Sequence, residues 1–184
     1  MLISSITHGS YANGPGKRNV LHTQGCSIGC PGCFNPHTWS TKQGEERDVE
    51  DIYKELTSGD IEGITISGGE PTEQWGEVSQ LLRLVRENRP ELSVVLFTGI
   101  SLDRLPDDAS VADVVVSGPY ERALPCEDPL RSSENQTIVF MTDRYNKEDL
   151  DSLPRVEVHI DENGGTISGF PSGYLVRALK KEMG

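Results

Sequence analysis

Hydrophobic positions along the chain follow two different spacings. Helical spacing predicts two amphipathic helices, at residues 48–57 and 73–88, and Asp48 is the expected N-cap of the first. Short continuous apolar runs predict buried strands, which lie at residues 61–67, 92–98 and 111–116. Buried strands that alternate with helices are typical of a parallel sheet covered by helices, so the pattern predicts an α/β fold.

The remaining segments predict shorter elements around this core. An alternating strand is expected at residues 19–24 and another strand at 137–141. Residues 118–136 hold three prolines and many charges, which predicts a long loop that either docks a partner or links two elements. Strands at 156–160 and 166–170 flank Asn163-Gly164 and predict a hairpin, and residues 172–183 predict a short closing helix.

Length and charge narrow the range of functions. The 184 residues fit one domain, which we expect to span the whole chain, residues 1–184. With 17 Lys and Arg against 29 Asp and Glu, the net charge is −12, which disfavours nucleic acid as a partner. No apolar run approaches the roughly 20 residues that span a membrane, and the first ten residues do not resemble a secretory signal. We therefore expect a cytoplasmic protein with no membrane partner.

Three of the four cysteines lie within eight residues, as Cys26-x3-Cys30-x2-Cys33, and Cys126 stands apart. Three thiolates with glycines between them can hold one soft metal centre. Electron carriers use four cysteines for each [4Fe–4S] cluster, so three ligands leave one iron open to bind a small molecule. Two other interpretations are a zinc site completed by His37 and a closed cluster completed by Cys126.

A second motif, Gly68-Gly69-Glu70-Pro71, follows the predicted strand at 61–67. It therefore lies at the carboxyl edge of the sheet, where α/β proteins bind ligands. Glycine lets backbone groups approach a polar ligand closely, and Glu70 offers an acceptor for an ammonium group. A plain turn between strand and helix is the simpler interpretation. Because the cysteine loop also follows a strand, both motifs are expected at one site.

These motifs resemble those of the radical S-adenosylmethionine (SAM) superfamily. Within it, the chain is most similar to the activating proteins of anaerobic (class III) ribonucleotide reductase, over residues of about 10–140. The similarity is carried by residues 13–18, 25–39, 67–71, 98–99, 117–120 and 132–136. Two positions depart from the family pattern, with Glu70 where Asp is frequent and Glu134 interrupting a Ser-Ser-Asn-Gln run. Residues 141–184 would form an extension beyond the similar core.

The resemblance implies the cofactors and the residues that hold them. Cys26, Cys30 and Cys33 would ligate a single [4Fe–4S] cluster, and SAM would bind its open iron. The methionyl end of SAM would lie against Gly68, Gly69 and Glu70. Its adenosyl part would lie against Gly32, Cys33 and Phe34, the residues at the last ligand. No catalytic residue beyond the cluster and SAM is implied, and Cys126 is placed outside the site.

The resemblance also implies a fold, a reaction and partners. The fold would be an incomplete (βα) barrel with mainly parallel strands, since a complete eightfold barrel takes about 250 residues. The enzyme, an oxidoreductase, would cleave SAM to a 5′-deoxyadenosyl radical and generate a glycyl radical on a large reductase. Reduced flavodoxin or ferredoxin would donate the electron. One alternative is a radical SAM enzyme acting on a small molecule, nucleoside or peptide, and another is a zinc or closed-cluster protein for structure or electron transfer.

Overall fold

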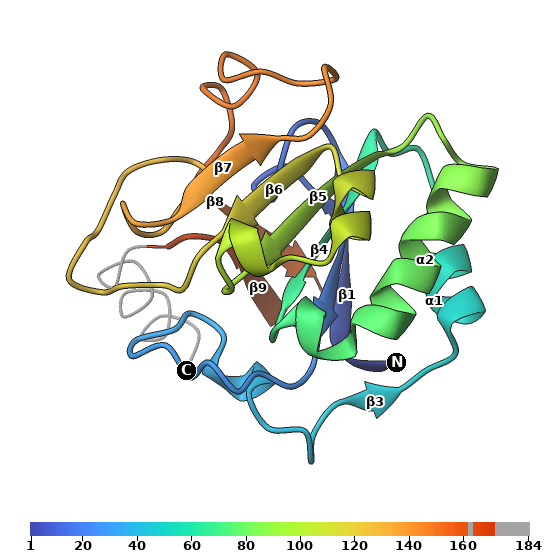
Figure 1. The fold of residues 1–184 in the computed structure, drawn as a ribbon, viewed down its shortest axis with the longest axis horizontal. Coiled ribbons are helices and arrows are strands. Elements are labelled where there is room, and N and C mark those ends of the chain that lie inside the picture. The colour runs from blue at the N-terminus through green and yellow to red at the C-terminus, as the bar shows by residue number, and fades with distance from the viewer. Residues whose placement is uncertain (162–163, 172–184) are drawn as a thin grey trace.

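The computed structural model of the protein describes residues 1–161 and 164–171 and shows a mixed α/β fold (Figure 1). Its main sheet has seven strands in the order β3-β1-β2-β4-β5-β6-β7. β2, β4, β5 and β6 run parallel, while the pairs β1–β2, β1–β3 and β6–β7 are antiparallel. The strands are β1 (Leu2–Ser10), β2 (Arg18–Thr23), β3 (Glu45–Glu46), β4 (Gly63–Gly68), β5 (Ser93–Thr98), β6 (Val114–Ser117) and β7 (Thr137–Phe140).

Two α-helices cover one face of this sheet, α1 (Val49–Leu56) and α2 (Trp75–Asn88) (Figure 1). The Asp48 side chain caps α1 by accepting a hydrogen bond from the Glu50 amide, as predicted. Apolar side chains of both helices pack with alternate residues of the strands, among them Leu21, Ile66 and Leu96, into the main hydrophobic core. The predicted helices and parallel strands are therefore confirmed.

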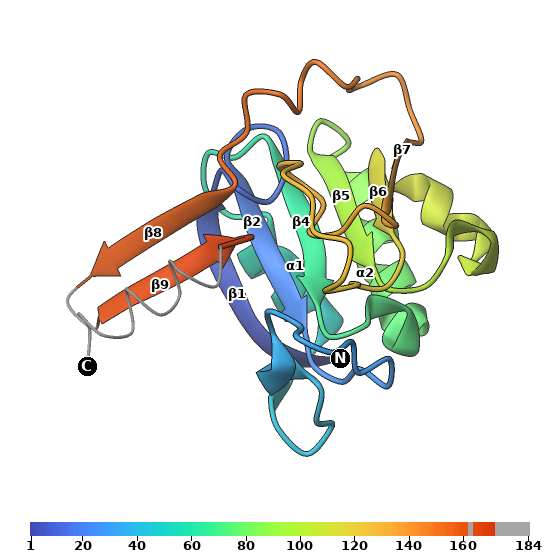
Figure 2. The ribbon, with the colours of Figure 1, turned by 90° about the vertical axis from the view of Figure 1, so that its left-hand side faces the viewer.

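The opposite face of the sheet carries the other set of alternating side chains and has a different cover. Residues 118–136, the segment after β7, and a hairpin of β8 (Val156–Asp161) and β9 (Gly164–Gly169) lie on this side. Figure 2 shows the hairpin beside β1, away from α1 and α2. A smaller apolar cluster here includes Val116, Leu130 and Leu150. The hairpin confirms a prediction from the sequence, and residues 162–163 lie outside the described chain.

Three features differ from the sequence-based expectations. The first ten residues, interpreted only as lacking a secretory signal, form the antiparallel strand β1. The strand predicted from residue 111 begins at Val114, because residues 107–111 form a 3-10 helix (Asp107–Val111). The central strands β2, β4, β5 and β6 are parallel as expected, whereas β1, β3 and β7 at the two edges of the sheet pair antiparallel. The helix predicted at 172–183 lies outside the described residues.

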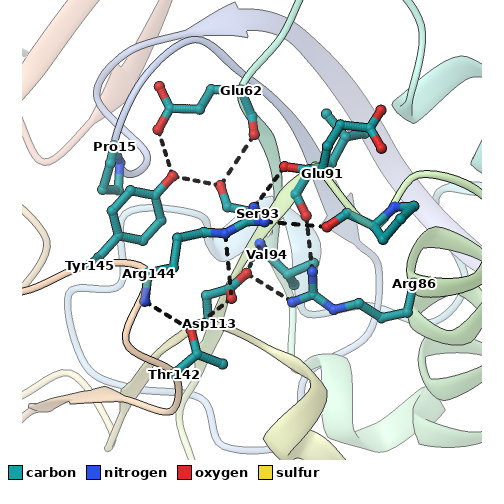
Figure 3. Close-up of polar contacts among 12 residues, drawn as sticks. Pro15, Glu62, Arg86, Glu91, Ser93, Val94, Asp113, Thr142, Arg144 and Tyr145 are labelled. Atoms are coloured by element: carbon teal, nitrogen blue, oxygen red, sulfur yellow. Dashed lines mark hydrogen bonds and ion pairs between the residues drawn. The ribbon is translucent and has the colours of Figure 1, made fainter.

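The segment that follows β7 is tied to the amino-terminal end of the parallel strands (Figure 3). Thr142 donates a hydrogen bond to Asp113 Oδ1 (2.8 Å), and Arg144 donates to the Glu91 carbonyl (2.7 Å). The Tyr145 hydroxyl donates to Glu62 (2.6 Å) and lies 2.8 Å from Ser93 Oγ. These contacts attach the start of the C-terminal extension to the core. None of the helices in the described residues is long and apolar enough to cross a membrane.

Candidate functional site

The cysteine loop and the Gly68-Gly69 turn meet at the carboxyl ends of two paired strands. β2 and β4 are parallel neighbours, and their last residues, Thr23 and Gly68, are register partners. Beyond the strands, the Gly69 amide donates to the Thr23 carbonyl and the Glu70 amide donates to the Gly25 carbonyl, both at 2.8 Å. The prediction that both motifs belong to one place is confirmed, since the hydrogen-bonded ladder continues from the strands into the two loops.

Glycine is required at both positions of this turn. Gly68 has φ +106°, and a Cβ atom there would lie 2.3 Å from the Thr23 nitrogen. A Cβ on Gly69 would lie 2.2 Å from the Gly25 carbonyl oxygen. Any side chain at Gly69 would therefore push the cysteine loop away from β4. The glycines hold the two loops in contact in addition to any contact they make with a ligand.

The loop that carries the three cysteines is built from tight turns. The Cys33 amide donates to the Cys30 carbonyl (3.0 Å), and Gly29 and Gly32 adopt left-handed φ values of +63° and +83°. The Asn35 amide donates to the Cys33 Sγ atom at 3.3 Å. All three thiols are half-buried and none forms a disulfide. The loop thus presents three free sulfurs within eight residues.

The electrostatic environment of Cys26 reflects its partial burial. Burial raises the pKa of the Cys26 thiol, and the carboxylates of Glu70 and Glu73 raise it further. Backbone hydrogen bonds from Gly29 and Ile28 act in the opposite direction, lowering this pKa. Such backbone donors stabilise the thiolate form that a metal requires.

The donor set fits an iron–sulfur cluster. Thiolates are the usual ligands of such clusters, and hydrogen bonds to their sulfurs tune the potential. Cys33 and Cys26 both accept hydrogen bonds from backbone amides of the loop. The three thiols of the loop do not form a group that could hold a single metal ion. The same is true of every other set of three His, Cys, Asp or Glu side chains in the described chain, which includes all four cysteines.

A cavity of about 290 Å³ lies next to the cysteine loop, on the face of the sheet away from the helices. Among the residues predicted to contact SAM, it is lined by Cys33, Phe34, Gly68 and Gly69. Further lining comes from strand residues on this face, which include Thr7, His22, Ser67, Phe97 and Val116. Gly32 lies at the side of the loop, where a Cβ atom would be 3.2 Å from Arg122. The structure thus brings most of the predicted contacts to one cavity.

Glu70 is held differently from the other predicted contacts. Its side chain is 2% exposed and is absent from the lining of the cavity. Its Oε1 atom accepts hydrogen bonds from the amide and hydroxyl of Thr72 and from the Thr98 hydroxyl, and Oε2 accepts from the Gly99 amide (2.7 Å). Glu70 therefore links the turn after β4 to the end of β5. A contact with the ammonium group of a ligand stays a prediction.

Sequence reasoning missed the polar residues on the far wall of the cavity. His22, which no sequence motif singled out, lines the cavity, and its ring lies 3.3 Å from the Thr7 hydroxyl. Burial, with a smaller effect of nearby His37, lowers the pKa of His22 to about 4. The ring is therefore neutral at pH 7. Leu21, the preceding residue of β2, faces the helices. Because successive side chains of a strand point to opposite faces, this alternation could have assigned His22 to the cavity face.

The long loop at residues 118–136 is ordered by its own side chains. Gln136 Oε1 accepts hydrogen bonds from the amides of Ser132 and Ser133 and from the Ser132 hydroxyl. The Cys126 thiol donates to the Arg131 carbonyl at 3.3 Å, and Cys126 is absent from the lining of the 290 Å³ cavity. It lines a second hollow of about 550 Å³, together with Phe34, Tyr120 and Arg155 among others.

Comparison with known proteins identifies the family. Residues 12–139 match the family model of a 4Fe-4S single cluster domain. The chain is 33% identical over 146 residues to the anaerobic ribonucleoside-triphosphate reductase-activating protein of Enterobacteria phage T4, covering 76% of this chain and 94% of the phage protein.

Two other relatives support the same family assignment. The protein of the same name from Vibrio cholerae is 35% identical over 139 residues, covering 68% of this chain and 89% of that protein. The pyruvate formate-lyase-activating enzyme of Streptococcus mutans is 39% identical over 93 residues, which are 47% of this chain and 35% of the enzyme. The chain therefore belongs to the anaerobic ribonucleoside-triphosphate reductase-activating proteins of the radical SAM superfamily, as its motifs suggested.

Proposed function

We propose that this protein is an activase that cleaves SAM reductively and generates a glycyl radical on an anaerobic ribonucleotide reductase. The observation that carries the proposal is the meeting of the cysteine loop with the Gly68-Gly69 turn, where Thr23 and Gly68 end paired strands. This meeting supports the proposal because a cluster held by the cysteine loop and a ligand bound at the Gly68-Gly69 turn would then lie side by side at one edge of the sheet. Membership of the activating-protein family supports the same reaction.

In this proposal Cys26, Cys30 and Cys33 hold one [4Fe–4S] cluster, which supplies an electron for SAM cleavage when bound. The backbone at Gly68 and Gly69 receives the methionyl end of SAM, because no side chain stands between it and the cavity. Phe34 and Cys33, with Gly32 beside them, face the adenosyl end. Glu70 keeps the Gly68-Gly69 turn in place through its contacts with Thr98 and Gly99.

The proposed fold is an incomplete (βα) barrel in one domain spanning residues 1–184. Its parallel strands β2, β4, β5 and β6 carry the ligand-binding loops at their carboxyl ends, as barrel enzymes do. An open side of such a barrel lets a glycine-bearing segment of a large partner reach the cavity. A hydrogen atom then passes from that glycine to the 5′-deoxyadenosyl radical, which leaves the unpaired electron on the partner. Reduced flavodoxin or ferredoxin is the proposed electron donor.

The first experiment compares two cysteine variants after anaerobic reconstitution with iron and sulfide. Wild type and Cys126→Ala should each bind about four iron atoms per chain and release 5′-deoxyadenosine from SAM with dithionite. Cys33→Ala should lose most of the iron and all of this product. Cys126 is the matched control because it is also a half-buried free thiol. Equal loss in both variants would point to a closed four-cysteine cluster, and stoichiometric zinc in the wild type would contradict the proposal.

A second experiment addresses the partner. The reconstituted protein, SAM and reduced flavodoxin are incubated with the large subunit of an anaerobic ribonucleotide reductase, and electron paramagnetic resonance records the radical. A glycyl radical signal is expected only when SAM is present. SAM cleavage without this signal would redirect the search to a small-molecule, nucleoside or peptide substrate.

A further inference from the structure

The hairpin β8–β9 supplies one wall of the cavity from outside the matched family domain. That domain ends at residue 139, whereas the hairpin starts at Val156. Four consecutive residues at the end of the hairpin line the cavity, namely Ile167, Ser168, Gly169 and Phe170. The opposite walls are strand residues of the domain and the end of the cysteine loop. The site is therefore completed by a segment that the family match does not include.

Phe170 joins the hairpin to the cysteine loop through aromatic contacts. Its ring packs edge-on against Phe34, with centroids 6.0 Å apart and an interplanar angle of 70°. It also packs against Phe97 of β5 at 6.1 Å. Phe34 in turn packs against Tyr120 at 5.4 Å and remains 39% exposed. Phe34 is thus held between two rings, one from the long loop and one from the hairpin.

Both strands of the hairpin are attached to the domain. The Asn13 amide group donates to Ser168 Oγ (2.6 Å), and Glu157 accepts a hydrogen bond from the Tyr11 amide (2.8 Å). The Phe170 amide donates to the Arg155 carbonyl (2.7 Å), and Gly169 has φ +88° with no space for a Cβ atom beside that carbonyl. These contacts orient the end of β9 toward the cavity.

We propose that Phe170 is a positioning residue, which holds the Phe34 ring at the cavity wall where the adenosyl group of SAM binds. This inference rests on the proposed function. An adenine ring is flat and aromatic, so it gains most from a rigid wall of rings with edge and face contacts. Without Phe170, Phe34 keeps only its contact with Tyr120 among these rings, and it has more freedom to turn into solvent.

The test is SAM binding to the reconstituted full-length protein, measured by equilibrium dialysis of labelled SAM. Phe170→Ala should raise the Kd for SAM about three- to tenfold, the range expected for loss of one aromatic pair. Phe170→Tyr keeps the ring and should bind SAM as the wild type does. Val158→Ala is the matched control, because Val158 lies on the same hairpin but is 42% exposed. Iron content should be equal in all four proteins.

Phe170→Leu distinguishes the effect of the aromatic ring from the effect of side-chain size. It replaces Phe170→Ala in the test if the alanine variant does not fold. It should weaken SAM binding although it keeps an apolar side chain of similar size. Wild-type affinity in the alanine or leucine variant, equal weakening in Val158→Ala, or no recovery in Phe170→Tyr would overturn the role of Phe170. In each of those cases, the proposed function still holds if the wild type cleaves SAM. A wild type that binds iron but no SAM would overturn both.

Discussion

The two faces of the central sheet are built from the same strands but are covered in different ways. On one face, residues such as Ile64, Ile66 and Leu96 are fully buried beneath α1 and α2. On the other, Ser67 and Phe97, their neighbours in β4 and β5, line a cavity covered by loops and a hairpin. The helix-covered face is close-packed and apolar, whereas the cavity face mixes hydroxyls, an imidazole and aromatic rings.

This difference shows how a short chain separates stability from chemistry. Successive side chains of a strand point to opposite faces, so one residue can stabilise the core while the next contacts a ligand. The cavity face tolerates polar groups because it is not filled. Its cover comes from residues 118–136, which connect β6 to β7, and from the hairpin β8–β9, which follows β7 in the chain. The following predictions test this separation, from the largest expected effect to the smallest.

Ile66→Ala should lower the free energy of unfolding by about 2–5 kcal/mol, because it leaves a cavity in the close-packed face. Its neighbour on the other face, Ser67→Ala, should change stability by less than about 0.5 kcal/mol. Urea unfolding of the two variants measures both effects. Comparable losses of stability in the two would mean that the faces are not separate.

Glu70→Ala should lower the free energy of unfolding by about 2–3 kcal/mol, because the Thr72 and Gly99 amides lose a buried acceptor. We also expect weaker SAM binding with the iron content unchanged, since the Gly68-Gly69 turn loses its link to β5. Glu73→Ala is the matched control, because this carboxylate is exposed and accepts hydrogen bonds only from Ser27 among the described contacts. A Glu70 variant as stable as the control would contradict the linking role.

His22 should make stability depend on pH in a defined window. The folded protein keeps this ring neutral down to about pH 4, whereas the unfolded chain protonates it near pH 6.5. The unfolded state therefore binds more protons between these values, and stability falls as the pH drops from 6.5 to 4. We expect a loss of about 1–2 kcal/mol, reduced from the full effect because the ring faces the cavity. Thermal unfolding of His22→Gln should lack this part of the pH dependence, and identical profiles would exclude it.

Local patterns were sufficient to predict much of the fold. The apolar stripes of α1 and α2 and the Asp48 cap depend on neighbours within one or two turns, so they can be read along the chain. The parallel strands were recognised because burial on both faces requires continuous apolar runs. β1 escaped prediction because its hydroxyl-rich, half-buried sequence becomes a strand only through pairing with β2.

For the site, too, some features could be predicted from the sequence, whereas others depend on the tertiary structure. The sequence by itself determined where the three cysteines and the two glycines would lie, because each motif directly follows a strand and strand ends share an edge. Tertiary structure decided that Glu70 is buried against β5, that His22 faces the cavity, and that Phe170 completes its wall. Those outcomes depend on contacts between residues 15 to 136 positions apart, which no local periodicity encodes.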